Sequence, residues 1–273
     1  MKNLILLVTF VCSLFLFCDS TSAQAPINSN VAIQPNKGGL ILRQRITVTE
    51  ADKTPMANTS VDMTMSMSTL IYGVSEKFTL MLNIPVRIQS KTTNSVTGVE
   101  NDLSGLNDIK IMGKFRLFRD DFGPMNTQRF DLLAGVEIPT GRDAFTSDST
   151  DPIFGGVYTY KKDRHAFSTD LLWKFNTGNG NLGEDQLTYD FAYVYRLTPD
   201  VYSSNDPTAL FGSIELNGSY ETNNDQEIFL SPGISYRKTQ WALEATVQIP
   251  IHQRLDNRME RDYVFGVGFK VRF

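Results

Sequence analysis

The last twelve residues of the chain, 262–273, read D-Y-V-F-G-V-G-F-K-V-R-F. In an extended strand, successive side chains point to opposite faces. The apolar and largely aromatic face of this stretch carries Tyr263, Phe265, Val267, Phe269, Val271 and Phe273. The opposite face is small or basic and carries Val264, Gly266, Gly268, Lys270 and Arg272. The alternation predicts a β-strand whose two faces meet different surroundings.

The chain ends on an aromatic residue, Phe273, that stays in register with the apolar face. This arrangement resembles the terminal strand of bacterial outer-membrane β-barrels. The resemblance implies that the apolar face meets outer-membrane lipid. It also implies that the aromatic residues of the strand are part of a signal recognised by the barrel-assembly machinery: Tyr263, Phe265, Phe269 and Phe273.

The amino terminus predicts export. Lys2 precedes an apolar run over residues 4–17, and small and polar residues follow over 19–25, as in a cleaved secretory signal peptide. We expect residues 1–23 to be removed by cleavage after Ala23. The run is too short for a membrane-spanning helix. A lipoprotein anchored through Cys18 is the alternative, but Phe17 stands where such an anchor needs a small residue.

Composition narrows the function classes. Both cysteines, Cys12 and Cys18, lie in the segment expected to be removed, which leaves the mature chain without a disulfide or a thiolate metal site. The formal net charge of −4 does not favour a nucleic-acid partner. After the signal, no apolar run is long enough to cross a bilayer as a helix. A membrane barrel and a soluble periplasmic β-sandwich remain.

Period-two alternation runs through the rest of the chain as one domain, residues 40–273. We expect twelve strands of about 10 residues, the length that crosses an outer membrane when tilted. They cover residues 40–49, 61–72, 77–89, 108–118, 129–140, 152–161, 166–176, 186–197, 210–221, 227–237, 241–251 and 262–273. An even number places both ends in the periplasm. The longest extracellular loops are then 90–107 and 142–151.

Aromatic residues favour the membrane barrel over the sandwich. Girdles of aromatic residues mark both interfaces of membrane barrels. Outward-facing aromatics fall at the periplasmic strand ends, at Tyr72, Phe78, Phe130, Tyr160, Phe167, Tyr195, Tyr236, Trp241 and Phe273, and at the opposite ends, at Phe175, Tyr189, Tyr220 and Tyr263. The predicted fold is therefore all-β, a transmembrane antiparallel up-and-down β-barrel of about 12 strands. Residues 24–39 precede it as a periplasmic tail or a plug.

The same register divides the side chains between lipid and lumen. Val61, Met63, Met65 and Met67 are expected on the lipid face, together with the apolar row that begins at Phe78. The residues expected to face the lumen carry both signs of charge: Arg43, Arg45, Asp62, Arg87, Asp108, Lys110, Lys114, Arg116, Asp131, Glu137, Asp170, Lys174, Asp190, Arg196, Glu215, Arg237, Glu244, Lys270 and Arg272. They form either a ladder of ion pairs that stiffens the wall or a selectivity path for a polar solute.

Four stretches suggest a family when taken in order: YGVSEKF at 72–78, GLNDIK at 105–110, GVEIPTGR at 135–142 and LSPGI at 230–234. Together they resemble the outer-membrane family named for the meta-pathway of phenol degradation, a set of proposed transporters. Asn107 stands where a second glycine is expected. The resemblance implies a barrel that admits small molecules, including hydrophobic or aromatic compounds, and it supplies no catalytic residues.

Two other functions stay open. A barrel-embedded hydrolase would have to use His165, in a short turn, or His252, near Asp256, Glu260 and Asp262, and no nucleophile accompanies either histidine. A barrel that only anchors a partner is the other alternative. We expect a monomeric channel for passive uptake of a small-molecule solute, with no catalytic residue, no cofactor and no metal.

Overall fold

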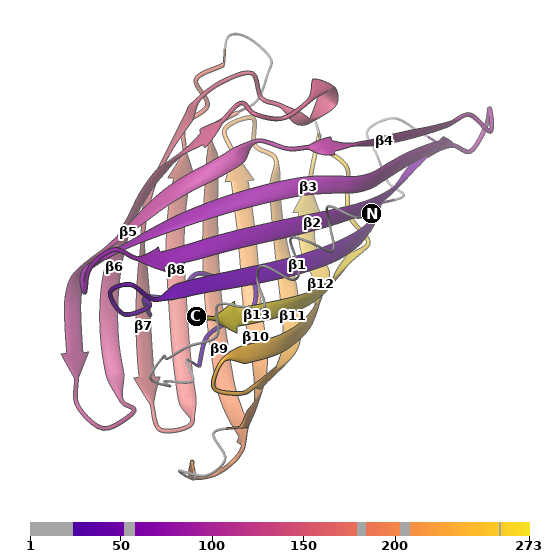
Figure 1. The fold of residues 1–273 in the computed structure, drawn as a ribbon. Coiled ribbons are helices and arrows are strands. Elements are labelled where there is room, and N and C mark those ends of the chain that lie inside the picture. The colour runs from indigo at the N-terminus through magenta and orange to yellow at the C-terminus, as the bar shows by residue number, and fades with distance from the viewer. Residues whose placement is uncertain (1–23, 52–57, 179–183, 203–207, 257) are drawn as a thin grey trace, which may run out of the picture.

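The computed structural model describes residues 24–51, 58–178, 184–202, 208–256 and 258–273. They form a closed antiparallel β-barrel of 12 strands with almost no helix, which confirms the predicted fold class (Figure 1). The wall strands are β1 (Leu40–Ala51), β2 (Thr59–Gly73), β3 (Phe78–Asn94), β5 (Ile109–Asp121), β6 (Thr127–Ile138), β7 (Asp151–Lys162), β8 (His165–Lys174), β9 (Gln186–Thr198), β10 (Ala209–Glu221), β11 (Gln226–Arg237), β12 (Trp241–Arg254) and β13 (Tyr263–Arg272). No helix in these ranges is long and apolar enough to cross a membrane.

The barrel closes between its first and last strands. Strand β1 pairs with β13 from Ile41 opposite Arg272 to Glu50 opposite Tyr263, and β2 links β1 to β3. Every wall strand therefore has two neighbours, and no edge of the wall is left unpaired. The apolar face of β13 points outward as its sequence predicts, with Phe265 46% exposed, whereas Val264 on the other face is 4% exposed.

Two rims define the ends of the barrel. We call the rim where β1 begins and β13 ends the terminal rim, and the opposite one the distal rim. At the terminal rim, the N–H of Phe273 donates to the carbonyl of Leu40 over 2.8 Å. The turn from β7 to β8 and the turn from β11 to β12 also lie there.

Aromatic rings gather on the outer face near both rims. At the terminal rim Tyr236 lies against Trp241 with ring centroids 5.7 Å apart, and Trp241 also approaches Phe269 at 6.4 Å. At the distal rim Phe154 and Phe175 are 6.3 Å apart. Side chains exposed on the outer wall between the rims include Leu132, Leu171, Phe191, Ile214 and Leu243. The wall thus carries an apolar band between two aromatic zones, as membrane barrels do.

The loop predicted over residues 90–107 is instead largely strand. Strand β3 continues to Asn94 and pairs with β4 (Glu100–Leu106) in an arm that extends beyond the barrel wall (Figure 1). The Lys91 ammonium and the Glu100 carboxylate form an ion pair of 2.8 Å on this arm. The arm lacks apolar alternation, so its sequence reads as a loop, but backbone pairing between strands needs no apolar side chains.

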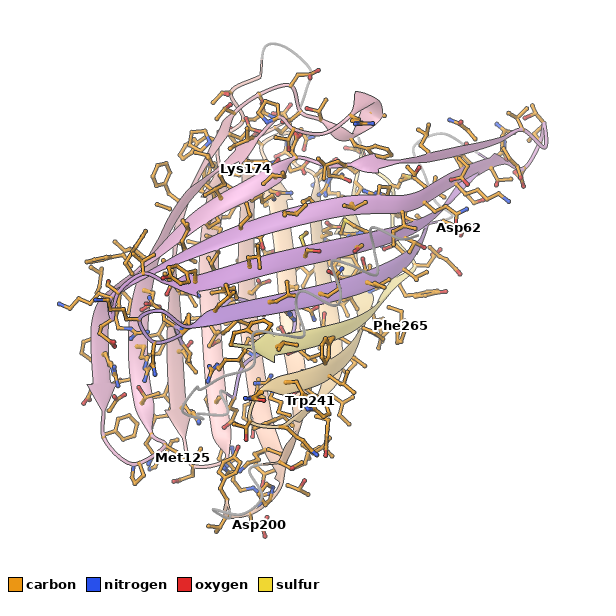
Figure 2. The ribbon with its side chains drawn as sticks, viewed as in Figure 1. Asp62, Met125, Lys174, Asp200, Trp241 and Phe265 are labelled. Atoms are coloured by element: carbon orange, nitrogen blue, oxygen red, sulfur yellow. The ribbon has the colours of Figure 1, made fainter. Side chains whose placement is uncertain are left out.

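Strand β2 presents to the lumen the face that the sequence pattern assigned to lipid. Met67 pairs with Arg45, whose side chain reaches the interior, whereas Ser66 pairs with Ile46, which is 40% exposed on the outside. The methionine row therefore faces inward. The prediction that Asp62 faces the lumen is wrong: it lies on the outer face, exposed at the distal end of β2 (Figure 2).

The register explains this reversal. Asp62 shares a row with Tyr72, which is 45% exposed, and a strand cannot place residues ten positions apart on opposite faces without a bulge. The position of Tyr72 therefore indicates the outward face of β2 better than the apolarity of the methionine row does. On the outside, Gln44 hydrogen bonds to the hydroxyls of Ser66 and Ser68, each over 2.6 Å, so these polar groups satisfy one another.

Candidate functional site: the barrel interior

Residues 24–35, which we call the inner segment, lie inside the barrel although they precede its first strand. Gln24 is 1% exposed, Ile27 2% and Ala32 0%. The segment has no regular secondary structure, so its backbone donors and acceptors need partners from the wall. Which wall residues supply these partners decides how firmly the segment is held.

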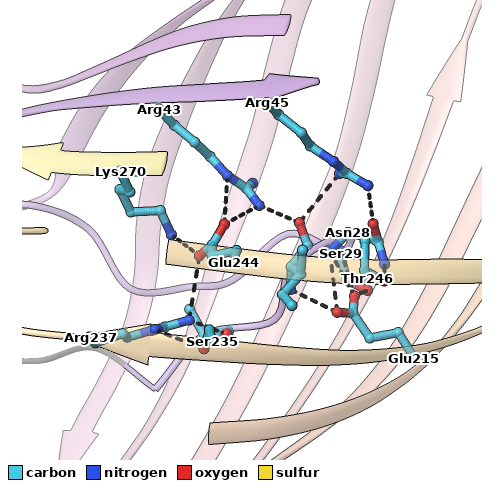
Figure 3. A network of polar contacts seen from close by, with 12 residues as sticks. Asn28, Ser29, Arg43, Arg45, Glu215, Ser235, Arg237, Glu244, Thr246 and Lys270 are labelled. Carbon is cyan, nitrogen blue, oxygen red and sulfur yellow. Dashed lines mark hydrogen bonds and ion pairs between the residues drawn. The ribbon is translucent and has the colours of Figure 1, made fainter. Parts of the chain in front are cut away.

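Two wall carboxylates hold the middle of the inner segment. Glu215 of β10 is fully buried and accepts the backbone N–H groups of Ile27, at 2.7 Å, and Ser29, at 2.8 Å, while the Ser29 hydroxyl donates at 2.7 Å (Figure 3). The Asn28 N–H also donates to Glu215, at 3.0 Å. Asp170 of β8 accepts the backbone and side-chain N–H groups of Asn30, each at 2.9 Å. Hydrogen bonds to a carboxylate are stronger than neutral ones.

Further bonds hold both ends of the segment. Arg237 donates to the carbonyl of Ala25 over 2.7 Å, and the Gln34 amide donates to Asp131 over 2.9 Å. Between these ends the Lys114 ammonium donates to the carbonyl of Val31 over 2.6 Å. The inner segment is thus bonded along its length to strands on several sides of the barrel.

A tight turn carries the chain from the interior into β1. Gly38 has φ of +80°, a conformation that favours glycine, and its N–H donates to the carbonyl of Gly73 over 2.7 Å. A Cβ atom on Gly73 would lie 2.1 Å from the carbonyl oxygen of Asn36. The two glycines therefore allow the backbones to approach closely at the terminal rim.

A charge cluster joins four consecutive strands where the barrel closes. The Glu244 side chain of β12 is fully buried and receives Arg43 of β1 at 2.7 Å, Lys270 of β13 at 2.9 Å and Arg237 of β11 at 3.6 Å (Figure 3). Three cations around one carboxylate leave excess positive charge facing the interior.

Other predicted lumen residues also form ion pairs. Glu137 lies 2.7 Å from the Lys110 ammonium and 3.2 Å from that of Lys174, and Arg116 lies 3.4 Å from Asp131. These contacts agree with the interpretation of the lumen charges as a ladder that stiffens the wall.

The remaining predicted lumen residues have different surroundings. Asp190 accepts the Asn217 amide over 2.9 Å, and Arg196 lies over the ring of Tyr202 at 4.3 Å. The Arg87 guanidinium lies 5.8 Å from the Phe145 ring, near the distal rim. Arg45 donates to Asn28 of the inner segment, and Arg272 lines a cavity at the terminal rim.

Among the described residues, sequence reasoning missed four further buried charged residues: Asp151, Lys161, Asp225 and Glu227. Lys161 shares its row in β7 with Val157 and Thr159, both fully buried, which is the signal that could have found it. Of the histidines considered for hydrolysis, His165 bonds to the Tyr193 hydroxyl over 2.7 Å at the terminal rim, and His252 is exposed opposite Ile228.

Asp108 lies at the distal rim, where it holds the loop between β6 and β7. One carboxylate oxygen accepts the Gly141 N–H at 2.9 Å, and the other accepts the Ser147 N–H at 2.6 Å and its hydroxyl at 2.8 Å. Burial of the carboxylate raises its pKa, but the hydrogen bonds from Ser147 and Gly141 outweigh burial, and the pKa of Asp108 lies below its ordinary value.

We expect acid to loosen this loop. Because the folded-state pKa of Asp108 is lowered, its contribution is present above the ordinary value of 3.8 and is lost as pH falls through the folded-state value. Amide exchange should show lower protection factors at Gly141 and Ser147 below pH 3.8, and Asp108→Asn should reproduce the loss at neutral pH. Asp102→Asn on the arm is the control. Unchanged protection in Asp108→Asn would contradict the assignment.

Two cavities lie against the inner segment. The larger, of about 350 Å³, reaches the distal ends of β5, β8 and β9 at Lys110, Lys174 and Gln186. The smaller, of about 130 Å³, lies at the terminal rim beside the turn that precedes Trp241. The cavities share five lining residues: Ala25, Val31, Ile71, Lys114 and Lys270. The two cavities therefore adjoin beside the inner segment, which Glu215 of β10 and Asp170 of β8 bind.

Comparison with known proteins bears on the fold. No protein-family model matches the chain, and no curated protein matches its sequence. Among solved structures, an outer membrane channel from Pseudomonas putida F1 is similar, with 12% identity, coverage of 91% of this chain and 100% of that one, and a TM-score of 0.63. The beta domain of the Bordetella autotransporter Brka is similar at 9% identity, with coverage of 87% and 100% and a TM-score of 0.53. The resemblance to the phenol-degradation family stays a prediction.

Proposed function

We propose that this chain is an outer-membrane channel for passive uptake of small molecules, including hydrophobic or aromatic compounds. One observation carries the proposal: cavities that approach both rims adjoin beside the inner segment and share five lining residues. A barrel of twelve strands is wider than the eight-stranded type that side chains fill, so an inner segment can narrow its lumen without filling it.

Location and assembly belong to the same proposal. The apolar outer band and the aromatic zones fit a lipid bilayer, and the terminal rim would then face the periplasm. Export would use the signal peptide predicted over residues 1–23, which lie outside the described residues. The barrel-assembly machinery would recognise the aromatic row of β13, and the folded protein would act as a monomer.

Conductance across planar bilayers tests this function. We expect the refolded mature protein to give discrete openings, and Ile71→Trp to lower their conductance by about half, because Ile71 lines both cavities and pore width limits conduction. The matched control is Leu70→Trp, which enlarges the neighbouring side chain in the outward-facing row of Tyr72. A folded barrel that never conducts would contradict the channel and support an anchoring role.

A further inference from the structure

The larger cavity has two chemically different parts. Its cations are Arg43, Arg45, Lys110, Lys114, Lys174 and Lys270, and no aspartate or glutamate belongs to its described lining. Its larger apolar side chains are Met67, Ile71, Met81, Met112, Ile153 and Leu172. A cavity with basic groups and a separate apolar strip matches a molecule that has one anionic group and an apolar body.

The interior carboxylates satisfy these cations unevenly. Glu137 serves both Lys110 and Lys174, and Glu244 serves both Arg43 and Lys270. Each carboxylate thus carries one formal negative charge for two cations of the cavity, and Glu244 also pairs with Arg237.

The other two cations of the cavity, Lys114 and Arg45, donate to neutral oxygens of the inner segment. Lys114 donates to the carbonyl of Val31, and Arg45 donates to the side-chain oxygen of Asn28 and to the carbonyl of Ile27. Nε of Arg45 is buried and has no hydrogen-bond partner among the described residues. The described lining thus combines six cations, and no carboxylate of its own, with an unused donor.

Two carboxylates close to this cavity are already occupied by the inner segment. Asp170 and Glu215 accept backbone N–H groups of residues 27–30, and neither carboxylate belongs to the described lining of the cavity. A negatively charged ligand in the cavity therefore meets cations first. A cationic ligand of the same size would meet no carboxylate in the described lining.

We propose that the larger cavity binds a small monocarboxylate with an aliphatic or aromatic body, its carboxylate toward Arg45 and Lys114 and its apolar part against the methionines. Methionine side chains are flexible and adapt to apolar bodies of different shape. The volume of about 350 Å³ lies within the range of small-molecule sites. The proposal rests on the proposed function only in treating this ligand as a molecule that the channel admits.

Binding to the refolded protein in an uncharged detergent tests the site. Hexanoate is the probe. Acetate lacks its apolar chain, hexan-1-ol lacks its charge, and hexylammonium carries the opposite charge. We expect calorimetric titration, corrected with protein-free micelles, to show saturable hexanoate binding at least about tenfold tighter than that of the three comparison molecules.

Met67→Glu gives the sharpest variant. Met67 lies opposite Arg45 in the neighbouring strand, so a carboxylate there would pair with Arg45 and repel the ligand. We expect about a tenfold loss of hexanoate affinity, and a loss of less than about threefold in Met67→Gln, which has similar size and no charge. Heat-modifiable gel mobility confirms that each variant is folded.

The outcomes separate the site from the channel. Hexylammonium binding as tight as hexanoate binding, or equal affinity in Met67→Glu and Met67→Gln, would overturn the site. Saturable hexanoate binding by a barrel that stays silent in bilayers would overturn the channel and leave the binding site standing. Conductance without any hexanoate binding would overturn the binding site and leave the channel standing.

Discussion

Deleting residues 24–35 should raise single-channel conductance about threefold or more, because the inner segment occupies the lumen beside the two cavities and pore width limits conduction. Its buried residues, among them Gln24, Ile27 and Ala32, displace space that ions and water would otherwise fill. The measurement is the step size of openings in planar bilayers with wild type and deletion refolded in parallel. Equal step sizes would show that the segment does not limit conduction.

A point variant tests whether the attachment of the inner segment to the wall, rather than only its presence in the chain, limits conductance. Glu215→Gln keeps the chain intact but replaces the carboxylate that accepts the N–H groups of Ile27, Asn28 and Ser29. One of the two side-chain oxygens would then be replaced by an NH2 group that faces the N–H donors of the segment. The segment should therefore dissociate transiently, and the channel should show openings with the step size of the deletion variant. Asp190→Asn is the control, because Asp190 accepts its hydrogen bond from Asn217 of the wall. Openings of that size in Asp190→Asn would argue against a specific role for Glu215.

Glu244→Gln should destabilise the barrel by about 3–5 kcal/mol, the range seen when one partner of a buried ion pair is removed. Its side chain is fully buried, and the variant would leave Arg43, Arg237 and Lys270 close together without their shared carboxylate. These residues lie on β1, β11 and β13, so the loss falls where the barrel closes. Urea unfolding in phospholipid vesicles, followed by tryptophan fluorescence, measures the change in unfolding free energy.

An exposed ion pair is the matched control. Glu100→Gln breaks the pair with Lys91 on the β3–β4 arm, where the two side chains are 56% and 36% exposed. The expected effect is about 0–1 kcal/mol, because solvent screens exposed pairs. Equal effects of Glu244→Gln and Glu100→Gln would show that the buried cations are stabilised by groups other than Glu244.

Alternating patterns predicted the wall because most strands carry an apolar outer face and a more polar inner face. The rows of β13 and β3 could be assigned from their residues alone, since lipid excludes charge from one face and the other face tolerates it. In β2 neither row is charged through its middle, and the pattern pointed the wrong way. Hydrogen-bonded register with β1, which pairs Met67 with Arg45, decided the orientation.

Sequence alone determined the class of fold and the number of wall strands, because a two-residue period is a local property of an extended chain. Only the tertiary structure decided which charges meet, since Arg43 and Glu244 are 201 residues apart and come together by barrel closure. It also decided the place of residues 24–35, whose polar sequence suits a solvated tail as well as a plug. Their partners Glu215 and Asp170 lie on distant strands, and no local pattern encodes a contact between a backbone N–H and a carboxylate more than a hundred residues away.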